Sequence, residues 1–553
     1  MKRLPVVLFF LLLVSCNGFQ SLNRDYFNAL VLKAENERDK DLLREALNIA
    51  GNNEAFLKRI AIASGRIPDF QVFRKVAGKS RGDKEIADLL AITSMFNGAN
   101  FNKRNLVKIL SSLPFTEKVA VALLNTKDKM AFNIVLNRNK LMKYKLSPAI
   151  AFNLWRAKPF VNEKILKEYY EKSPFETVYS LYRLKVKGIA KAKDLKDADL
   201  NTKFYAMWIV DNPEKLLDEN IWQLKVAYLK ATEDKNQAKE LLNDKNPLVK
   251  ETAISVFLKK GGNWKVLDLN SFTPSQIEIA LPYIKDAKVV RKIFEKGGFY
   301  AYVSAPYLSK QDTPLVESSN IGWYKKLKFF ENIEGKSFAI EKAISIFEKS
   351  GDKKALCYLI EKVEEGVLKK SKVITLVGNK QGDYLSILSD AGIVKGKSKK
   401  LPLSYYLGAI KKAEKLKTFT IETDRGKVKC KFFSKDAPLT CLNFFKLADR
   451  GFFDGIFFHR VIPGFVAQAG DPTGTGYGGP NYSIRCEYNA FSYNSAGIIG
   501  MALAGKDTGG SQFFITHIAT PHLNYNYTVF AKVIDNFETL SRITRYTEIK
   551  HIK

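Results

Sequence analysis

The stretch that decides the fold of the C-terminal part is FFHRVIPGFVAQAGD, residues 457–471. It is rich in aromatic and apolar residues, and Arg460 is the only basic residue in it that is permanently charged. Aromatic residues are usually part of a hydrophobic core, and we expect this of four of them: Phe457, Phe458, Phe513 and Phe530. An arginine taken alone is as consistent with an ordinary surface charge. The segments on either side decide between these interpretations.

The residues before this stretch alternate between apolar and polar side chains, as strands do. Residues 418–423 and 428–432 alternate around a turn at Asp424-Arg425-Gly426, which predicts a β-hairpin. A helix is expected to begin at Ala437-Pro438. Because the pattern changes from helical to strand-like after Lys417, we place a domain boundary near Leu416.

Further blocks follow the opening stretch in order: Gly500-Met501-Ala502, residues 509–515, Pro521-His522-Leu523 and residues 527–530. Together with residues 457–471, these blocks resemble the cyclophilin-type peptidyl-prolyl cis-trans isomerases, and the resemblance covers residues 417–553. Several long blocks in the family's order are far more specific than one short motif. The resemblance implies a closed eight-stranded antiparallel barrel with two flanking helices, and an enzyme that uses no cofactor and no metal.

The reaction that the resemblance implies breaks no bond. Rotation about an X-Pro amide has a barrier of roughly 18–20 kcal/mol because the twisted amide loses its resonance, and uncatalysed exchange is slow. As the amide twists, the proline nitrogen regains a lone pair, so a fixed donor beside it stabilises the twisted state more than the planar states. A guanidinium is permanently charged, rigid and rich in donors. By similarity, Arg460 holds this position.

The resemblance assigns three positions to catalysis, namely Arg460, Phe465 and Gln468. It assigns substrate contacts to residues of an apolar proline pocket, its rim and its backbone contacts: Val466, Ala502, Leu503, Phe514, His522, Leu523 and Tyr527. The backbone contacts are those of Ala502 and Leu503, and the rim residues are His522 and Tyr527.

Three of these positions depart from the residues most frequent in the family. His522 stands where many cyclophilins have Trp, Val466 where many have Met, and Leu503 where Asn is frequent. Because the arginine and most of the apolar pocket are retained, we expect catalysis to survive. Strong cyclosporin binding is less well supported, since the Trp contributes to the drug contact.

Two nearby motifs suggest other chemistry. Residues 474–479, GTGYGG, match the glycine pattern of a dinucleotide loop, but Pro480 follows and no helix opens there, so we predict an ordinary loop. His459 beside Arg460 suggests acid-base catalysis. Since rotation of an amide transfers no proton, we predict a structural hydrogen bond for His459 instead.

Residues 25–416 are predicted to be helical. Apolar residues recur at helical spacing, and short polar or glycine-containing breaks separate such runs; one example is the set Leu43, Ala46, Leu47 and Ala50. The basic stretch 395–400 is expected to be a loop before the last helix of this region.

One segment of the helical region resembles a HEAT-type repeat. Residues 244–250 are followed by Ala253 and Phe257, and Asn246 and Pro247 are suited to the cap and the first position of a helix. The pattern does not recur at a fixed period. A HEAT-like solenoid is therefore our prediction, with an irregular helical bundle as the alternative.

The first residues resemble an export signal. Positive charge at Lys2-Arg3 precedes an apolar run over residues 4–14, which is shorter than the roughly 20 residues that span a bilayer. Residues 13–16 also resemble the bacterial lipobox. This predicts a signal peptide over residues 1–15, a lipid on Cys16, and a tether over residues 16–24. An ordinary signal peptide with an incidental cysteine is the alternative. The lipoprotein would be anchored on the periplasmic face of the inner or outer membrane, or on the cell surface.

The net charge of +32 lies mainly in the helical region. Residues 418–553 hold 15 basic and 11 acidic residues, a net +4, which leaves +28 for the first 417 residues. Solvated helix faces are the first explanation, attraction to an anionic membrane the second, and nucleic acid the last, because no nucleic-acid-binding motif is present. A protein partner on the helical surface is a further prediction.

Besides Cys16, the chain has four cysteines, namely Cys357, Cys430, Cys441 and Cys486. Their spacing is that of neither a disulfide scaffold nor a metal site, so we interpret them mainly as buried thiols. A bridge between Cys430 and Cys441 stays open at this point, because sequence does not test its geometry.

Two functions follow from these patterns. The first is an active prolyl isomerase that assists the folding of exported proteins, with proline-containing or unfolded polypeptides as substrates. The second is a non-catalytic chaperone or scaffold lipoprotein that binds proline-containing peptides. Retention of Arg460, Phe465, Gln468 and Phe514 favours the enzyme.

Overall fold

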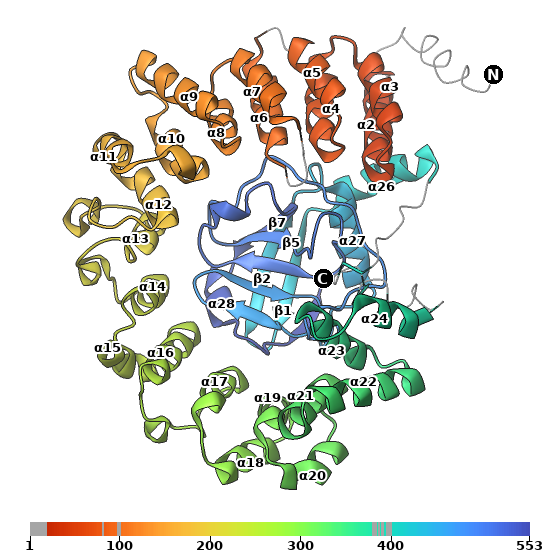
Figure 1. Ribbon diagram of the computed structural model, residues 1–553. Coiled ribbons are helices and arrows are strands. Elements are labelled where there is room, and N and C mark those ends of the chain that lie inside the picture. The colour runs from red at the N-terminus through yellow and green to blue at the C-terminus, as the bar shows by residue number, and fades with distance from the viewer. Residues whose placement is uncertain are drawn as a thin grey trace.

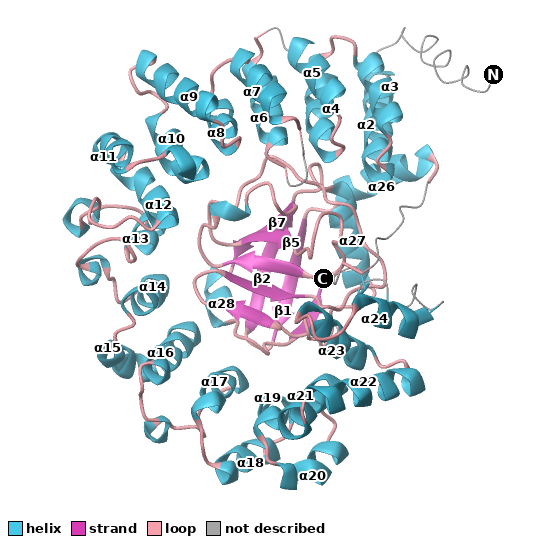
Figure 2. Cartoon of the chain, viewed as in Figure 1, coloured by secondary structure: helices cyan, strands magenta, loops and turns pink. Residues whose placement is uncertain are grey.

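The computed structural model describes residues 19–79, 82–96, 101–378, 384, 387–388, 392–393 and 401–553. Helices form an arc around a smaller domain built by the C-terminal residues (Figure 1). Figure 2 shows that the strands are gathered in this inner domain. The predicted signal peptide, Cys16 and the basic stretch 395–400 lie outside the described residues.

Most consecutive helices of the arc pack against each other, and many alternate helices also touch along the inner side. Stacked helix pairs pack in this way, each burying its apolar face against the next. The predicted helical region is confirmed, whereas its assignment as HEAT-like stays a prediction. The helices of the arc are α2 (Phe19–Glu37), α3 (Lys40–Ala50), α4 (Glu54–Arg66), α5 (Phe70–Lys79), α6 (Lys84–Ser94), α7 (Lys103–Ser112), α8 (Glu117–Asn125), α9 (Lys129–Leu141), α10 (Ser147–Asn153), α11 (Glu163–Lys172), α12 (Pro174–Leu184), α13 (Leu200–Ala206), α14 (Trp222–Thr232), α15 (Lys235–Glu240), α16 (Pro247–Lys259), α17 (Pro274–Ala280), α18 (Ala287–Glu295), α19 (Gly298–Ser304), α20 (Thr313–Ser318), α21 (Trp323–Glu334), α22 (Lys336–Ser350), α23 (Lys353–Glu364), α24 (Lys370–Val377) and α26 (Leu403–Lys415).

Local sequence signals set the positions of these helices. The four apolar residues whose spacing predicted a helix over residues 43–50 are all buried on α3. At the start of α16, the Asn246 side chain accepts hydrogen bonds from the backbone N–H groups of Leu248 and Val249, and Pro247 occupies the first helical position. Such a cap contributes about 1 kcal/mol.

The arc closes on itself where α26 packs against α2. The Nζ atom of Lys33 donates to the backbone carbonyl of Leu401 at 2.6 Å, and Asn36 donates to the hydroxyl of Tyr406 at 2.9 Å. Because α2 begins at Phe19, part of the stretch predicted as a tether is helical. The first and last helices of the arc are thus neighbours in space.

The inner domain is an antiparallel sheet with two helices, α27 (Pro438–Asp449) and α28 (Phe537–Arg542). The predicted hairpin is confirmed, since Thr423 pairs with Gly426 across a two-residue turn. The strand order is β3-β4-β6-β5-β7-β2-β1-β8. The strands are β1 (Thr418–Thr423), β2 (Gly426–Phe432), β3 (Arg460–Ile462), β4 (Val466–Ala469), β5 (Ile498–Met501), β6 (Phe513–Thr516), β7 (Val529–Asp535) and β8 (Ile549–Ile552).

The eight predicted strands are present, and the sheet that they form is curled. The two edges of the sheet meet at an isolated bridge between Phe457 and Glu548 and through backbone hydrogen bonds beside it. The Phe458 N–H donates to the carbonyl of Thr547, and the Tyr546 N–H donates to the carbonyl of Phe458, both at 2.9 Å. The eight-stranded antiparallel fold that the resemblance implied is confirmed. Its interior is aromatic, because Phe458, Phe513 and Phe530 are fully buried, as predicted.

Phe457 departs from the prediction that it belongs to this interior. Its ring packs against Phe299 of α19 at 5.0 Å between ring centres, and against Tyr546 at 5.5 Å. Nearby, Glu278 of α17 accepts hydrogen bonds from Arg545 at 2.5 Å and from Tyr546 at 2.8 Å. Phe457 therefore serves a contact between the arc and the inner domain, which its neighbours in sequence do not reveal.

The N-terminal helices of the arc make a second contact through a buried ion cluster. Glu35 of α2 is completely buried and lies 2.7 Å from Arg59, 3.1 Å from Arg66 and 3.4 Å from Arg485 of the inner domain. Burial raises the pKa of Glu35, but the interactions with Arg59, Arg66 and Arg485 outweigh burial and hold the pKa well below 4.5. The carboxylate is therefore charged at neutral pH.

The four cysteines beyond Cys16 are free and buried, so Cys430 and Cys441 form no bridge. Burial raises the pKa of Cys357 to about 12. Among the described residues, no helix combines the length and apolar character that a membrane crossing requires. The same part of the chain holds no group of three or more side chains suited to a metal ion.

Candidate functional site

Strand pairing brings three of the predicted site residues into one row. Arg460 on β3 pairs with Gln468 on β4, and Gln468 pairs with Phe514 on β6. Side chains directly opposite each other in antiparallel strands lie on the same face of the sheet. A cationic donor, an amide and an aromatic ring therefore stand side by side, although 54 positions separate Arg460 from Phe514.

Arg460 lies at the exposed end of this row. Its Nη1 atom donates to Oε1 of Gln468 at 3.3 Å, and the guanidinium carbon lies 5.9 Å from the centre of the Phe465 ring. Although the side chain is exposed, partial desolvation by surrounding protein lowers the pKa of Arg460 from 12.5. The group stays cationic at neutral pH, and a guanidinium has further N–H donors to offer a ligand.

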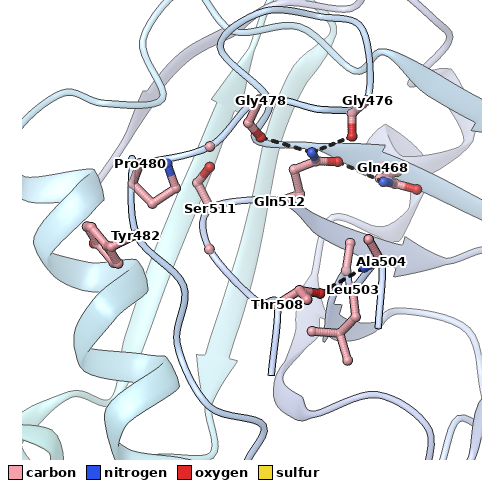
Figure 3. Close-up of a pocket in the computed structure, with 13 residues that line it drawn as sticks. Gln468, Gly476, Gly478, Pro480, Tyr482, Leu503, Ala504, Thr508, Ser511 and Gln512 are labelled. Carbon is pink, nitrogen blue, oxygen red and sulfur yellow. Dashed lines mark hydrogen bonds between the residues drawn. The ribbon is translucent and has the colours of Figure 1, made fainter. Parts of the chain in front are cut away.

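Gln468 is held in turn by Gln512, as Figure 3 shows. The Nε2 atom of Gln468 donates to Oε1 of Gln512 at 3.0 Å. The Nε2 atom of Gln512 donates to the carbonyl oxygens of Gly476 and Gly478 at 2.8 and 3.0 Å. Residues 474–479 thus form the predicted loop. The loop holds Gln512, and Gln512 in turn positions Gln468 beside Arg460.

The loop is organised by a buried carboxylate. Asp471 accepts hydrogen bonds from the backbone N–H groups of Thr473, Thr475 and Gly476 at 2.7, 2.8 and 2.5 Å. A Cβ atom at Gly478 would lie 1.9 Å from the Asp471 carboxylate, so the loop requires glycine there. This close approach explains the glycine at position 478.

A small cavity of about 110 Å³ lies beside Gln468 and Gln512 (Figure 3). Ala502 and Leu503, the two positions predicted to contact the peptide through their backbone, line it together with Thr508. The cavity and the Arg460 row share Gln468, so both belong to one continuous site.

An apolar cluster adjoins the row. Val466 and Phe514 are buried in it, and Phe465, Leu523 and Tyr527 are partly buried around them. The rings of Phe514 and Tyr527 meet edge to face, with 5.5 Å between centres. The cationic donor of the row therefore lies beside an apolar surface.

Close packing under this cluster depends on a glycine. A Cβ atom at Gly500 would lie 2.5 Å from the Phe514 ring and 2.2 Å from the hydroxyl of Tyr493. Gly500 pairs with Phe514 across β5 and β6. The aromatic floor of the site can therefore form only if this position has no side chain.

His522 lies at the predicted rim and also touches the arc. Its ring stacks on Phe465 with 5.5 Å between centres, and its Nδ1 atom lies 3.4 Å from the hydroxyl of Tyr179 on α12. Burial, with a smaller contribution from Arg183, lowers the pKa of His522 to about 4. The imidazole is therefore neutral at pH 7, and the rim is shared by both parts of the chain.

Two further helices fix the backbone on both sides of this rim. Tyr205 of α13 donates its hydroxyl to the carbonyl of Ala519, and Lys230 of α14 donates to the carbonyl of Pro463 at 2.6 Å. At Gly464, a Cβ atom would lie 3.0 Å from the ring of Phe204. The arc therefore contacts the segments that carry Phe465 and His522.

The structural hydrogen bond predicted for His459 is wrong. The ring is buried, and neither ring nitrogen has a hydrogen-bond partner among the described residues. Burial lowers the pKa of His459 to about 4, although Asp471 acts in the opposite direction. The neutral ring packs as an apolar group, which avoids the cost of burying a charge.

The structure thus brings the predicted site residues together as the row, the apolar cluster, the cavity and the rim. Sequence analysis did not predict Gln512 as a site residue. It lies within the block 509–515 that carries the resemblance, and its side-chain amide can hydrogen-bond to that of Gln468, so a signal for it was present. Sequence analysis also missed Tyr493, and the residues of the arc that touch the rim, such as Tyr179 and Lys230. For the arc residues no sequence signal was available, because they lie hundreds of positions away.

The curled eight-stranded sheet places an arginine, a glutamine and an aromatic cluster on adjoining strands, and comparison with known proteins identifies the class as peptidyl-prolyl isomerases. The model of the cyclophilin type peptidyl-prolyl cis-trans isomerase/CLD family matches residues 418–551. Through this domain, the chain belongs to the cyclophilin-type peptidyl-prolyl cis-trans isomerase family, whose substrates are proline-containing peptides.

Two curated relatives illustrate the match. Peptidyl-prolyl cis-trans isomerase B of Bacillus subtilis is 49% identical over 131 residues, which are 24% of this chain and 92% of the relative. A peptidyl-prolyl cis-trans isomerase of Synechococcus elongatus is 52% identical over 116 residues, 21% of this chain and 79% of the relative. A crystal structure of a cyclophilin type isomerase from Cryptosporidium parvum is 36% identical, covers 25% of this chain and 95% of that chain, and has a TM-score of 0.24.

Proposed function

We propose that Arg460 accelerates the rotation of X-Pro bonds by donating hydrogen bonds to the proline nitrogen as the amide twists. The observation that carries this proposal is the row on β3, β4 and β6, in which Gln468 holds the guanidinium beside Phe514. The apolar cluster holds the proline ring. Because the donors are fixed before the substrate binds, they stabilise the twisted amide without reorganising.

Gln468 has a positioning role in this mechanism. Its carbonyl oxygen accepts from Arg460, and its amide nitrogen donates to Gln512. This chain of hydrogen bonds fixes the amide so that its oxygen faces the guanidinium. The arginine thereby keeps one orientation, and its remaining donors are directed to the substrate.

The experiment that tests this mechanism is a protease-coupled isomerisation assay on the full chain with a neutral X-Pro peptide. Arg460→Ala removes the donor and is expected to lower kcat/KM by about 10²- to 10³-fold, the effect of losing one preorganised donor. Arg460→Lys keeps the charge without the rigid fork and should recover only part of the rate.

The matched control is Arg450→Ala, which removes an exposed arginine of the same domain and should leave the rate unchanged. Equal rates for the native protein and Arg460→Ala would contradict the proposed role of Arg460. A native protein that binds the peptide without isomerising it would favour the non-catalytic chaperone or scaffold.

We further propose that the protein is an exported lipoprotein, anchored through Cys16, which acts on exported polypeptides. The support is the charged start, the short apolar run and the lipobox-like residues 13–16. Growth with a labelled fatty acid should label the native protein but not Cys16→Ser. Equal labelling of both proteins would contradict the anchor while leaving the isomerase proposal intact.

A further inference from the structure

A large cleft lies between the arc and the isomerase domain at the rim of the site. Its volume is about 770 Å³, which lies within the range of ligand sites in proteins. The isomerase domain contributes Pro463, Gly464, Phe465 and His522 to its lining. Since Phe465 also packs against the apolar cluster, the cleft continues directly from the surface proposed to hold the proline ring.

The arc supplies aromatic rings to the same cleft. Tyr182 of α12, Phe204 and Tyr205 of α13, and Trp208 just after α13 all line it. Ring centres of Tyr182 and Trp208 are 5.4 Å apart, and those of Phe204 and Trp208 are 5.5 Å apart. Tyr182 and Trp208 keep part of their surface exposed. The cleft therefore offers a ligand an aromatic wall of the kind that contributes most at peptide interfaces.

The charged residues that line the cleft are all basic. Arg183, Lys185, Lys187 and Lys230 line it, and no aspartate or glutamate is among its lining residues. Lys185 and Lys187 are exposed, and neither has an ion-pair partner within the described part of the chain. Burial lowers the pKa of Lys230 to about 8, so this amine is still largely cationic at pH 7. Because four cations and no aspartate or glutamate are among its lining residues, the cleft has a positive potential that selects an acidic ligand.

We propose that this cleft binds acidic residues that flank the proline of the substrate, and that the arc thereby selects which X-Pro segments the isomerase domain acts on. The ligand is a polypeptide with Asp or Glu within a few residues of the X-Pro bond, and an aromatic or apolar neighbour adds contact with the ring wall. This inference deepens the proposed isomerase function and rests on it.

The direction of selection follows from charge. An extended peptide advances about 3.3–3.6 Å per residue, so residues close to the proline reach a cleft that begins at Phe465 and His522. An acidic residue there gains attraction to Lys185 and Lys187, whereas a basic residue meets only like charges. Discrimination therefore arises from both attraction and repulsion.

The test uses the full chain and three X-Pro peptides that differ only in carrying Glu, Gln or Lys near the proline on both sides. The native protein is expected to show the highest kcat/KM with the Glu peptide and the lowest with the Lys peptide. In the double variant Lys185→Glu, Lys187→Glu, kcat/KM for the Glu peptide should fall about threefold to tenfold, the size expected for exposed charges. The Gln peptide should be almost unaffected.

Two controls accompany this comparison. Lys288→Glu with Lys292→Glu reverses two exposed charges on α18, which do not line the cleft, and should leave the preference intact. Raising the salt concentration should shrink the preference for the Glu peptide, because exposed charges are screened within about 8–10 Å at ordinary ionic strength.

The possible outcomes distinguish the role of the cleft from the isomerase function itself. Turnover of all three peptides at equal rates by the native protein would overturn the role of the cleft while the isomerase function stands. An equal increase for all peptides in the double variant would also overturn it, because the arc would then only obstruct the site. Turnover of none of the peptides would overturn the isomerase function, and the inference with it.

Discussion

The arc holds the isomerase domain through contacts of opposite character. At α2 and α4, Glu35 is completely buried among three arginines. At α12 to α14, aromatic rings and donors to backbone carbonyls meet the domain beside an open, basic cleft. Removing a partner of a buried charge strongly destabilises the folded protein, whereas an exposed lysine is stable without an ion-pair partner. The comparison separates a contact that fixes the domain from one that leaves room for a ligand.

The largest effect is expected from removal of the buried carboxylate. Glu35→Ala leaves Arg59, Arg66 and Arg485 without their common partner, and should lower the free energy of unfolding by about 3–5 kcal/mol. Urea denaturation followed by circular dichroism measures this change, and kcat/KM per folded molecule should be unaffected. Glu54→Ala, which removes an exposed carboxylate of α4, should cost less than about 1 kcal/mol. If both variants lowered the free energy of unfolding by the same amount, the buried Glu35 cluster would not be the contact that fixes the domain.

The next effect is a difference in acid sensitivity. His522 has a pKa of about 4 in the folded protein and about 6.5 when unfolded, so the unfolded state binds more protons between these values. Its contribution to stability is lost as pH falls from 6.5 towards 4. The pKa of Glu35 is lowered from 4.5, so its contribution is lost only below pH 4.5. The contact at α12 to α14 should therefore weaken first.

Urea denaturation at pH 7 and pH 5 measures this sensitivity. The loss of unfolding free energy between the two pH values should be smaller in His522→Phe by about 1–2 kcal/mol. The variant His551→Gln, which changes an exposed histidine, should behave like the native protein. An unchanged loss in His522→Phe would show that His522 does not carry this pH dependence.

The smallest effect concerns one hydrogen bond at the open contact. Tyr205→Phe removes the donor to the Ala519 carbonyl and keeps the ring, so it should cost about 1 kcal/mol. Hydrogen exchange should rise around residues 519–523 and stay unchanged in α2 and α4. Tyr182→Phe is the control, since that hydroxyl makes no hydrogen bond within the described part of the chain. Increased exchange in α2 would mean that the two contacts are coupled.

Sequence patterns were sufficient for the fold of the isomerase domain, and they named the residues that the structure brings together in the candidate site. Long blocks in order predicted eight strands, and Arg460 and Gln468 are close enough in sequence to meet across a tight turn. Phe514 was assigned by resemblance alone, because strand pairing over such a distance is not visible in spacing. Gly500 is an example of a residue whose role is not visible in the sequence. Glycine is required there because the ring of Phe514 on the neighbouring strand leaves no room for a side chain.

The helices of the arc could be predicted from the sequence, but the way in which they curve around the isomerase domain could not. Caps and apolar spacing marked α3 and α16, since both are local signals. Glu35 reads in sequence as one more acid on a helix, because its burial depends on Arg485 far along the chain. Phe457 and His459 were misassigned for a related reason. Phe457 packs against α19, and His459 is buried without a hydrogen bond. Neither environment can be predicted from the adjacent residues in the sequence.

The position of Arg485 in the chain, 450 residues after Glu35, has a consequence for synthesis on the ribosome. At about 5–20 residues per second, roughly 20–90 s separate the appearance of these two residues. During that interval the helices of the arc emerge in order and stack locally. The isomerase domain follows these helices in the chain, so the arc can enclose it only after residues 417–553 have been made.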